Sequence, residues 1–229
     1  MNTDAFTGRA QAYTIARPGY PDAAIEYICS LVPTDAVFAD IGAGTGKFTE
    51  CIAKHGYNTY AVEPNSDMRA ELEKTLAPYP NAVILVGTAE ATTLSDHSVD
   101  VITCAQALGW FDLSAFRTEC RRIGKSGATV FSLYNSTLGD NYTPGSYRLS
   151  SRQAAEQFFQ NPQVREFTNV VLNTRERWIL SQISISDSPK PSESGYDEYI
   201  SESNEIFDRD SVDGYLRSEL VTLIYSERV

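Results

Sequence analysis

The sequence contains few of the residues that build metal and redox sites. It has two histidines and four cysteines among 229 residues. No cysteine pair has C-x-x-C spacing and no histidine has a partner at ligand spacing, so we expect no metal site. The apolar surroundings of most of the cysteines indicate buried free thiols rather than disulfides. These residues are Cys29, Cys51, Cys104, Cys120, His55 and His97.

Long apolar runs and dense basic runs are also missing. No stretch approaches the roughly 20 apolar residues of a membrane-spanning helix, and the first residues lack the pattern of a secretory signal. The net charge of −11 would repel DNA or RNA. We therefore expect a cytoplasmic protein, monomeric or homodimeric, that acts on a small molecule and has neither a membrane nor a nucleic-acid partner.

The apolar residues that are present follow alternating strand-like and helical patterns. They make up 42% of the chain, which is enough for one sizeable core. Their order predicts an α/β fold: a doubly wound, mostly parallel seven-stranded sheet with helices on both faces. The expected strands are 37–41, 59–62, 82–86, 99–104, 128–134 (after a turn at Gly124 and Gly127), 167–172 and 219–225. The expected helices are 22–31 (capped by Asp22), 47–54, 66–76 (capped by Asn65 or Ser66), 113–123, 151–160, 176–183 and 196–207.

We expect a single domain over residues 1–229. Residues 135–151 are polar and predict a loop or lid. An N-terminal lid is expected over 1–21, and cap elements are expected over 135–165 and 176–215.

A strand that runs straight into a loop of small residues is the strongest functional signal. The segment reads Val37-Phe-Ala-Asp-Ile-Gly-Ala-Gly-Thr-Gly46. Backbone N–H groups in such a loop come close to a ligand, and side chains larger than a methyl group at Gly42 and Gly44 would block that approach. Asp40 and the three glycines together satisfy the pattern acid-x-G-x-G-x-G.

Other interpretations of this loop fit less well. A phosphate-binding P-loop needs glycine at position 41 and Ser or Thr at position 48, where Ile41 and Phe48 stand. A dinucleotide fingerprint needs glycine at position 47, where Lys47 stands. A tight turn without any ligand remains possible on the loop alone.

A carboxylate at the end of the next strand favours a nucleoside ligand. Glu63 follows the strand at 59–62 and stands 23 residues beyond Asp40. A carboxylate at that place can accept hydrogen bonds from both ribose hydroxyls, and it would repel a 2′-phosphate. Alone, such a glutamate would more often be a solvated turn residue, but the loop and the glutamate together predict an adenosine-type site.

The first half of the chain contains four motifs, Asp40-Ile-Gly-Ala-Gly-Thr-Gly46, Val62-Glu-Pro-Asn-Ser-Asp-Met68, Gly87-Thr-Ala-Glu-Ala-Thr-Thr-Leu94 with Ser98-Val-Asp-Val-Ile102, and Ala105-Gln-Ala-Leu-Gly-Trp-Phe-Asp112. Together they resemble those of class I S-adenosylmethionine-dependent methyltransferases of the methyltransferase-11 type. The segment Ala12–Pro21 and the tail around 183–189 and 206–208 are similar to a subgroup of trans-aconitate methyltransferase-like proteins. The resemblance therefore covers most of the chain and implies S-adenosylmethionine as the cofactor.

The resemblance also implies where the methionine part of this cofactor would bind. Asp40 would steady its ammonium group, and Arg17 could pair with its carboxylate, although a surface ion pair would explain Arg17 as well. Tyr13 would belong to the same N-terminal lid. Ala105 and Gln106, at the tip of the fourth strand, would meet the methionine end.

The rest of the cofactor would lie along the loop and the second strand. Met68 is explained equally well as a core residue of its helix. The residues that the resemblance assigns to the ribose and its surroundings are Gly42, Ala43, Gly44 and Glu63, and those assigned to the adenine are Pro64, Asn65, Met68, Ala89 and Glu90.

One departure from the family concerns the acceptor pocket. Many relatives carry histidine immediately before the Trp-Phe pair, whereas this chain has Gly109. That change removes a candidate base or substrate anchor and puts the family's usual substrate in doubt. The residues expected to line the pocket are Trp110, Tyr134 and Asn135, as catalytic candidates, with Tyr142 and Tyr147 from the lid.

Methyl transfer from a sulfonium needs mainly positioning and exclusion of water, so a missing base does not exclude it. We expect methylation of a small molecule. Two alternatives stay open. One is an enzyme that cyclises the aminobutyrate chain of S-adenosylmethionine and releases methylthioadenosine. The other is a cofactor-binding protein without catalysis.

Overall fold

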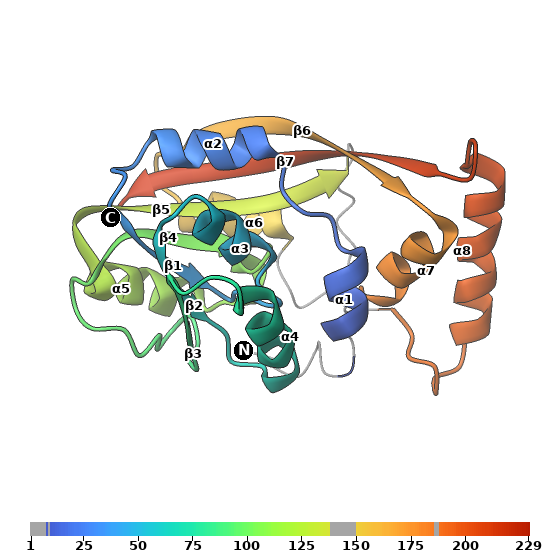
Figure 1. Cartoon of the computed structure of the whole chain (residues 1–229), viewed down its shortest axis with the longest axis horizontal. Helices are drawn as coiled ribbons and strands as arrows, with labels where there is room; N and C mark the ends of the chain where they lie inside the picture. The colour runs from blue at the N-terminus through green and yellow to red at the C-terminus, as the bar shows by residue number, and fades with distance from the viewer. Residues whose placement is uncertain (1–7, 9, 138–149, 186–187) are drawn as a thin grey trace.

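The structure is a computed structural model that describes residues 8, 10–137, 150–185 and 188–229 (Figure 1). The strands are β1 Val37–Ile41, β2 Asn58–Val62, β3 Ala82–Leu85, β4 Val99–Ala105, β5 Gly124–Thr137, β6 Gln163–Asn173 and β7 Leu216–Arg228. The helices are α1 Ala10–Ala16, α2 Asp22–Ser30, α3 Lys47–Lys54, α4 Ser66–Leu76, α5 Leu113–Ile123, α6 Ser151–Phe158, α7 Arg175–Ile183 and α8 Tyr196–Asp210, with a 3-10 turn η1 at Leu108–Trp110.

All seven strands form one sheet in the order β3-β2-β1-β4-β5-β7-β6. The pairs among β1 to β5 are parallel, and only β7 runs antiparallel to its neighbours β5 and β6. This arrangement confirms the predicted doubly wound, mostly parallel seven-stranded sheet. The strand order places the carboxyl ends of β1 and β4 side by side at the point where the order reverses, which is where open α/β sheets bind ligands.

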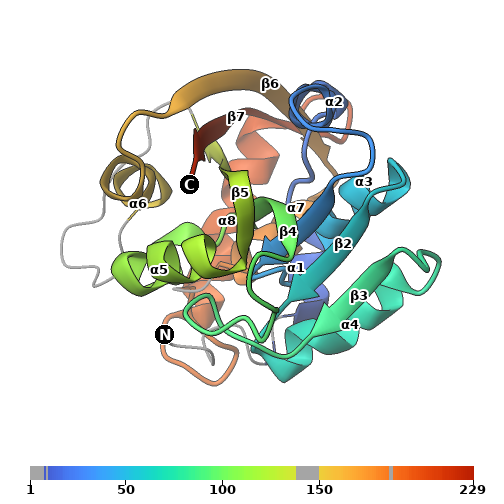
Figure 2. The same ribbon diagram turned by 90° about the vertical axis from the view of Figure 1, so that its left-hand side faces the viewer.

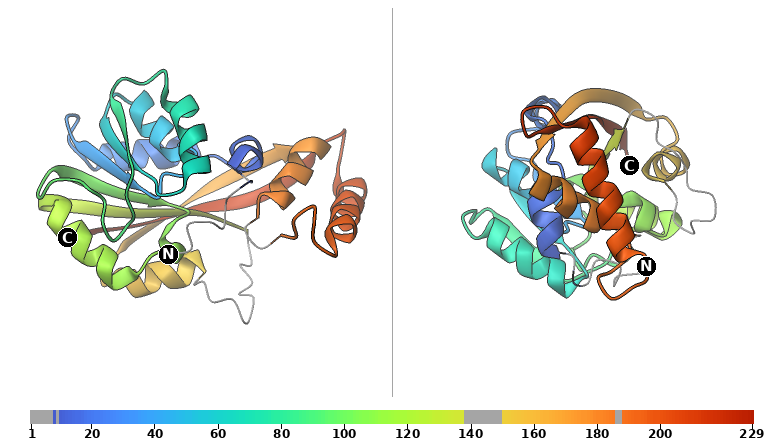
Figure 3. Two further views of the ribbon diagram at one scale, coloured as in Figure 1. Left: turned by 90° about the horizontal axis from the view of Figure 1, so that it is seen from below. Right: turned by 90° about the vertical axis from the view of Figure 1, so that its right-hand side faces the viewer.

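Helices cover both faces of the sheet. Helices α2, α3 and α4 lie on one face and α5 and α6 on the other (Figures 2 and 3). Alternate residues of β1 point to opposite faces, so Phe38 joins the core under α2 and α3 while Ala39 joins the core under α5 and α6. Both side chains are completely buried, which explains why the residues of β1 are apolar on both faces apart from Asp40.

The strands on one side of the sheet are much longer than those on the other. Strands β5 and β7 pair from Thr129↔Arg228 to Thr137↔Leu220, and β6 follows β7 along its own full length. The long strands carry α7 and α8 beyond the carboxyl edge of β1 and β2 (Figure 1). Helix α1 packs against both α4 and α7 and so bridges the two parts.

Several predicted boundaries were wrong. Residues 135–137 are not part of a loop, because β7 pairs with β5 as far as Thr137. No turn separates α5 from β5, because Gly124 already pairs with Val99. Gly127, whose φ is +81°, lies in a β-bulge at the start of β5. Asp22 does not cap α2 either: the cap position is Pro21, and Asp22 lies in the first turn, where its charge favours the helix dipole.

The cysteines are free, but only two of the four are buried. Cys104 and Cys120 are buried, whereas Cys29 and Cys51 are half-buried. The expectation of four buried thiols was therefore wrong for these two, which pack at the margin of the core under α2 and α3. No helix within the described residues is long and apolar enough to cross a membrane.

Candidate functional site

The predicted glycine loop connects β1 to α3 at the carboxyl edge of the sheet. Gly42, Gly44 and Gly46 have positive φ values of +69°, +58° and +88°. Side chains with a Cβ rarely adopt this backbone conformation, so all three positions favour glycine. The N–H groups of Gly42 and Ala43 both bond to the carbonyl of Val62, which fastens the loop to the end of β2.

The three glycines differ in what a side chain would meet. A Cβ at Gly42 would lie 2.8 Å from the Cβ of Ala107, and one at Gly46 would lie 2.7 Å from Cδ1 of Leu72. A Cβ at Gly44 would have no neighbour within 4 Å. Packing inside the protein therefore already requires glycine at positions 42 and 46, and the side of the loop that is open to a ligand is at Gly44.

Glu63 lies under this open position. Its Oε2 accepts a hydrogen bond of 2.8 Å from the N–H of Gly44, and its Oε1 accepts one of 2.9 Å from the N–H of Asn65. Burial raises the pKa of this carboxyl, and the two backbone donors partly offset the effect. Each carboxylate oxygen can accept a further hydrogen bond, so ribose hydroxyls remain possible partners.

Asp40 is buried beneath the loop and held from two sides. Its Oδ2 accepts a hydrogen bond of 2.6 Å from Thr49 of α3, and its Oδ1 accepts one of 3.0 Å from Thr103 of β4. Burial nevertheless raises the pKa of Asp40 to about 6. The sequence analysis missed both threonines, because nothing in their spacing from Asp40 marks them as partners.

Hydrogen bonds between the first turns of α4 and the segment after β2 hold the residues expected around the adenine. Asn65 caps α4 by accepting from the N–H of Met68, whose side chain is buried. The side chain of Arg69 donates from Nη1 to the carbonyls of Glu63 and Pro64. The sequence analysis missed Arg69, which fixes the backbone that follows β2.

The segment with Ala89 and Glu90 is tied to α5. Ala89 is buried, and Oε1 of Glu90 accepts a 3.0 Å hydrogen bond from the N–H of Asp112, which caps α5. A second carboxylate, Glu119, accepts from both the N–H and the hydroxyl of Thr92. The expected adenine edge is therefore held in place from two points of α5.

At the tip of β4 the chain adopts a strained conformation. Gln106 has a φ of +61°, which is uncommon for a residue with a side chain and is often found at binding sites. Its N–H donates to the carbonyl of Leu133. Ala105, the last residue of β4, is only half-buried, so the backbone here lies at the edge of the site.

Arg17 connects α1 to α7. Its guanidinium lies over the ring of Tyr13, with 5.5 Å between Cζ and the ring centroid, and its Nη2 donates to the carbonyl of Ser184. Its Nε is buried and has no hydrogen-bond partner among the described residues. The predicted surface ion pair is therefore not what holds Arg17 within the described residues, and its Nε is left with an unused donor.

The three catalytic candidates have clear packing roles. Trp110 is half-buried against the core beneath α5. Tyr134 is buried and stacks on Tyr225, with ring centroids 6.0 Å apart. Asn135 donates to the carbonyl of Gly19. Contact of these three with an acceptor stays a prediction, and Tyr142 and Tyr147 lie outside the described residues.

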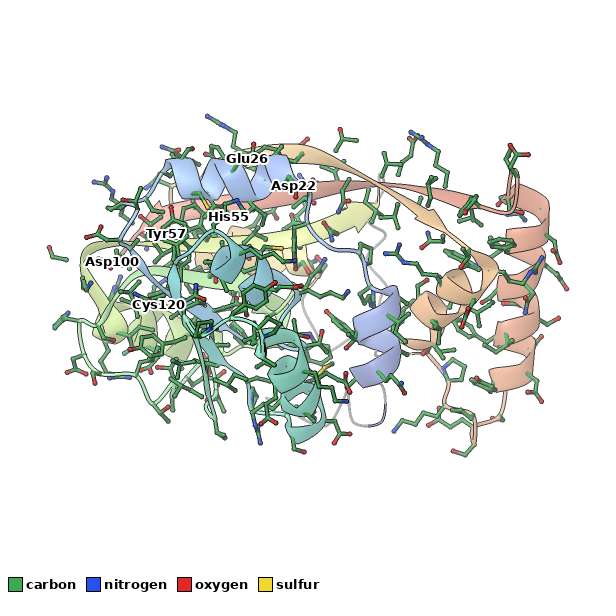
Figure 4. All side chains as sticks on the ribbon, viewed as in Figure 1. Asp22, Glu26, His55, Tyr57, Asp100 and Cys120 are labelled. Atoms are coloured by element: carbon green, nitrogen blue, oxygen red, sulfur yellow. The ribbon has the colours of Figure 1, made fainter. Side chains whose placement is uncertain are left out.

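Asn135 belongs to a polar group that the sequence analysis missed. Its Oδ1 accepts from Asn169 of β6 and Thr222 of β7, and Asn169 also donates to the carbonyl of Gly19. The histidines take no part in the site: His97 bonds to the carbonyl of Gly124, and Figure 4 shows His55 beside α2, on the side of the molecule away from α7 and α8.

Comparison with known proteins supports this picture. Residues 39–132 match the family model described as "Methyltransferase domain". An uncharacterized methyltransferase of Mycobacterium tuberculosis is 34% identical over 131 residues, which cover 57% of this chain and 52% of that protein. An uncharacterized methyltransferase-like protein of Schizosaccharomyces pombe is 34% identical over 127 residues. The chain thus spans about half the length of the curated relatives it matches.

Solved structures share the fold at low sequence identity. A type II methyltransferase candidate from Anaeromyxobacter dehalogenans has a TM-score of 0.68 at 18% identity, covering 93% of this chain and 97% of that one. A geranyl diphosphate C-methyltransferase from Streptomyces coelicolor, solved with S-adenosyl-L-homocysteine, has a TM-score of 0.51 at 15% identity, covering 91% and 77%. Residues 39–132, which include the glycine loop, therefore match the methyltransferase domain family, and the described part of the chain shares its fold with solved methyltransferases.

Proposed function

We propose that this protein transfers the methyl group of S-adenosylmethionine to a small molecule. The observation that carries the proposal is the position of Glu63. Its carboxylate is buried directly beneath Gly44, the one glycine of the loop where a Cβ would meet open space. A carboxylate at a loop opening of this kind suits the two hydroxyls of a ribose.

The remaining residues fit the same cofactor. The buried Asp40 suits the ammonium group of the methionine part, and the unpartnered Nε of Arg17 suits its carboxylate. Glu90 and the backbone at Ala89 suit the adenine edge. When bound, S-adenosylmethionine supplies a methyl group that its sulfonium charge already activates.

The protein's own part in the reaction is to position the acceptor and exclude water. Helix α1 lies between α4 and α7 and covers the carboxyl edge next to the loop. Neither histidine lies there, so the acceptor is one that needs no histidine base at this site.

Two observations favour a small acceptor. The net charge of −11 opposes binding of a nucleic acid. The fold also occurs in a protein named as a geranyl diphosphate C-methyltransferase. We also propose that the protein belongs to the trans-aconitate methyltransferase-like subgroup. This proposal rests on the sequence resemblance of the segments around Arg17 and residues 183–189.

The test is to incubate the purified protein with S-adenosylmethionine alone and with a metabolite extract, and to analyse both by mass spectrometry. We expect S-adenosylhomocysteine only when the extract is present, together with a product one methylene heavier than its precursor. The Glu63→Ala variant should form less of both.

Two results would contradict methyl transfer. Methylthioadenosine formed from S-adenosylmethionine alone would establish the cyclisation alternative. Tight binding of S-adenosylmethionine without turnover in any extract would indicate a cofactor-binding protein without catalysis.

A further inference from the structure

A group of polar side chains on the sheet holds the connection between α1 and α2. Asn135 of β5 and Asn169 of β6 both donate from their side-chain nitrogens to the carbonyl of Gly19, each over 3.0 Å. Oδ1 of Asn135 in turn accepts from Asn169 and from Thr222 of β7, the strand between β5 and β6. Three neighbouring strands therefore supply one hydrogen-bonded group that ends on a single backbone oxygen near the N-terminus.

The rest of this sheet face is apolar. Leu133 and Ile224 belong to the core under α2 and α3, and Phe167 packs against that core. Each of the three polar residues stands two positions from one of these on its strand, and so lies on the same face. Thr222 and Asn169 are buried. Polar groups at such positions are unfavourable unless they are hydrogen-bonded, so the sheet gives up apolar packing where it meets the α1–α2 connection.

The carbonyl of Gly19 is a firm point of attachment. A carbonyl oxygen has two lone pairs, so Asn135 and Asn169 together use its full capacity. Pro18 and Pro21 restrict the backbone torsions on both sides of Gly19. Holding this one oxygen therefore fixes the course of the residues around it.

Those residues lead to the candidate cofactor site. The ring of Tyr20 packs edge-on against that of Phe48, with 5.4 Å between the centroids, and Phe48 is the second residue of α3 after the glycine loop. On the other side of Gly19, Arg17 lies over the ring of Tyr13. The buried Nε of Arg17 is the donor that we assign to the methionine carboxylate. The position of Gly19 thus sets the positions of Tyr20 and Arg17.

The polar group also reaches the tip of β4. Nε2 of Gln106 donates to the backbone carbonyl of Asn135 over 3.5 Å. Gln106 is the residue with a φ of +61° at the expected methionine end of the site. Asn135 therefore contacts both the N-terminal connection and the strand tip, the two parts of the chain that we assign to the methionine end.

We propose that Asn135 and Asn169 are positioning residues for the cofactor, which hold α1 and Arg17 at the candidate site through the carbonyl of Gly19. Neither side chain has to touch S-adenosylmethionine in this role. Without the two hydrogen bonds, α1 and the residues up to Pro21 separate more often from the sheet, and the cofactor dissociates faster. This inference rests on the proposed function.

Asn173 offers a matched control on the same strand and face. It is buried like Asn169, but its described side-chain hydrogen bond goes to the hydroxyl of Ser218 on β7 rather than to Gly19. Asn169→Leu and Asn173→Leu each remove one buried amide of β6, so both should lower the free energy of unfolding. Only Asn169→Leu also releases Gly19.

The first measurement is the dissociation rate of S-adenosylhomocysteine, followed by stopped-flow displacement. We expect the rate constant to rise about fivefold or more in Asn169→Leu and in Asn135→Leu, because one hydrogen bond to Gly19 is lost in each. In Asn173→Leu it should stay within about twofold of the wild-type value.

Hydrogen–deuterium exchange of residues 10–21 separates positioning from a loss of overall stability. We expect exchange there to be about fivefold faster in Asn169→Leu than in Asn173→Leu, because only the first variant favours local opening of this segment. Asn169→Asp serves if Asn169→Leu does not fold: it keeps the size and polarity of the side chain but replaces the donor with an oxygen, and Asn173→Asp is its control.

Two results would overturn the proposal. One is an equal dissociation rate in the variants at positions 169 and 173. The other is exchange over residues 10–21 that the variants at position 169 leave unchanged. If the wild-type protein does not bind S-adenosylhomocysteine at all, the proposed function fails instead.

Discussion

The carboxylates around the site have hydrogen-bond partners within the protein, whereas two of the cations lack a carboxylate partner among the described residues. Asp40, Glu63 and Glu119 each accept at least two hydrogen bonds from groups of the protein. Lys47 and Arg177 have no carboxylate partner among the described residues. The edge formed by β1 and β2 is thus already organised, whereas helix α7 carries an arginine, Arg177, whose buried Nε has no hydrogen-bond partner among the described residues.

This difference has a consequence for ligand binding. A ligand at the organised edge meets donors and acceptors already held in position, so little reorganisation accompanies binding. We therefore expect the first region to bind the cofactor.

The largest effect should come from the glycine that packs against the protein itself. Gly42→Ala places a methyl group 2.8 Å from the Cβ of Ala107 at a φ of +69°. We expect a loss of about 3 kcal/mol in the free energy of unfolding in urea. Gly44→Ala introduces backbone strain but no steric clash, so it should lower the free energy of unfolding by only about 1 kcal/mol. Its main effect should be weaker binding of S-adenosylhomocysteine. Equal stability losses in the two variants would contradict the conclusion that Gly42 packs against the protein whereas Gly44 faces open space.

Substitution of Glu119 measures how much a hydrogen-bonded carboxylate contributes to the free energy of unfolding. Burial alone would raise its pKa, but hydrogen bonds from Arg122 and Thr92 lower the pKa from 4.5 to about 2. The stabilisation is therefore present above pH 4.5 and is lost as the pH falls toward 2. Glu119→Gln should lower the free energy of unfolding by about 2 kcal/mol at pH 7.

A matched control for Glu119→Gln is Glu156→Gln, which breaks an exposed ion pair with Arg152. Its effect should stay within about 0.5 kcal/mol, because exposed ion pairs contribute little. If both variants lose the same stability, the segment at Thr92 does not depend on the buried carboxylate of Glu119.

Glu63→Ala tests the ribose assignment directly. We expect the affinity for S-adenosylmethionine to fall at least tenfold, roughly 1.4 kcal/mol, because both the hydroxyl acceptor and the support of Gly44 are lost. Glu73→Ala, an exposed change on α4, is the control for calorimetry. An unchanged affinity in Glu63→Ala would mean that the ribose lies elsewhere.

The smallest effect concerns the pH dependence of binding. Because the pKa of Asp40 is raised to about 6, its carboxyl takes up a proton as the pH falls through that value, and the charge that would hold the ammonium group disappears. We expect the affinity to drop about fourfold between pH 7 and pH 5.5. Asp40→Asn should bind more weakly and without this pH dependence, and a variant that keeps the dependence would assign it to another group.

Local patterns predicted the first half of the fold closely. The bounds of β1, α3, α4 and α5 agree with the expectation residue for residue. Their signals are all short-range: a β-branched or aromatic run, a glycine at a turn, a capping Asn65. The cofactor loop and Glu63 could be recognised for the same reason, because their spacing follows from one strand, one turn and one helix.

Partners that are far apart in the chain could not be predicted in this way. The lengths of β5 and β7 depend on pairing between segments more than 80 residues apart, and polar residues such as Asn135 look like loop until their partner strand is known. Asn169 and Thr222 approach Asn135 only across the sheet.

By itself the sequence determined the α/β order of the elements, the glycine loop with its acidic residues, and the class of cofactor that they suit, because each depends on contacts over a few residues. Only the tertiary structure decided that Gly44 is the open glycine, that Asp40 is held by Thr49 and Thr103, and that Arg177 keeps a buried Nε without a hydrogen-bond partner among the described residues. Those facts depend on which side chains folding brings together and on how much water it removes from them.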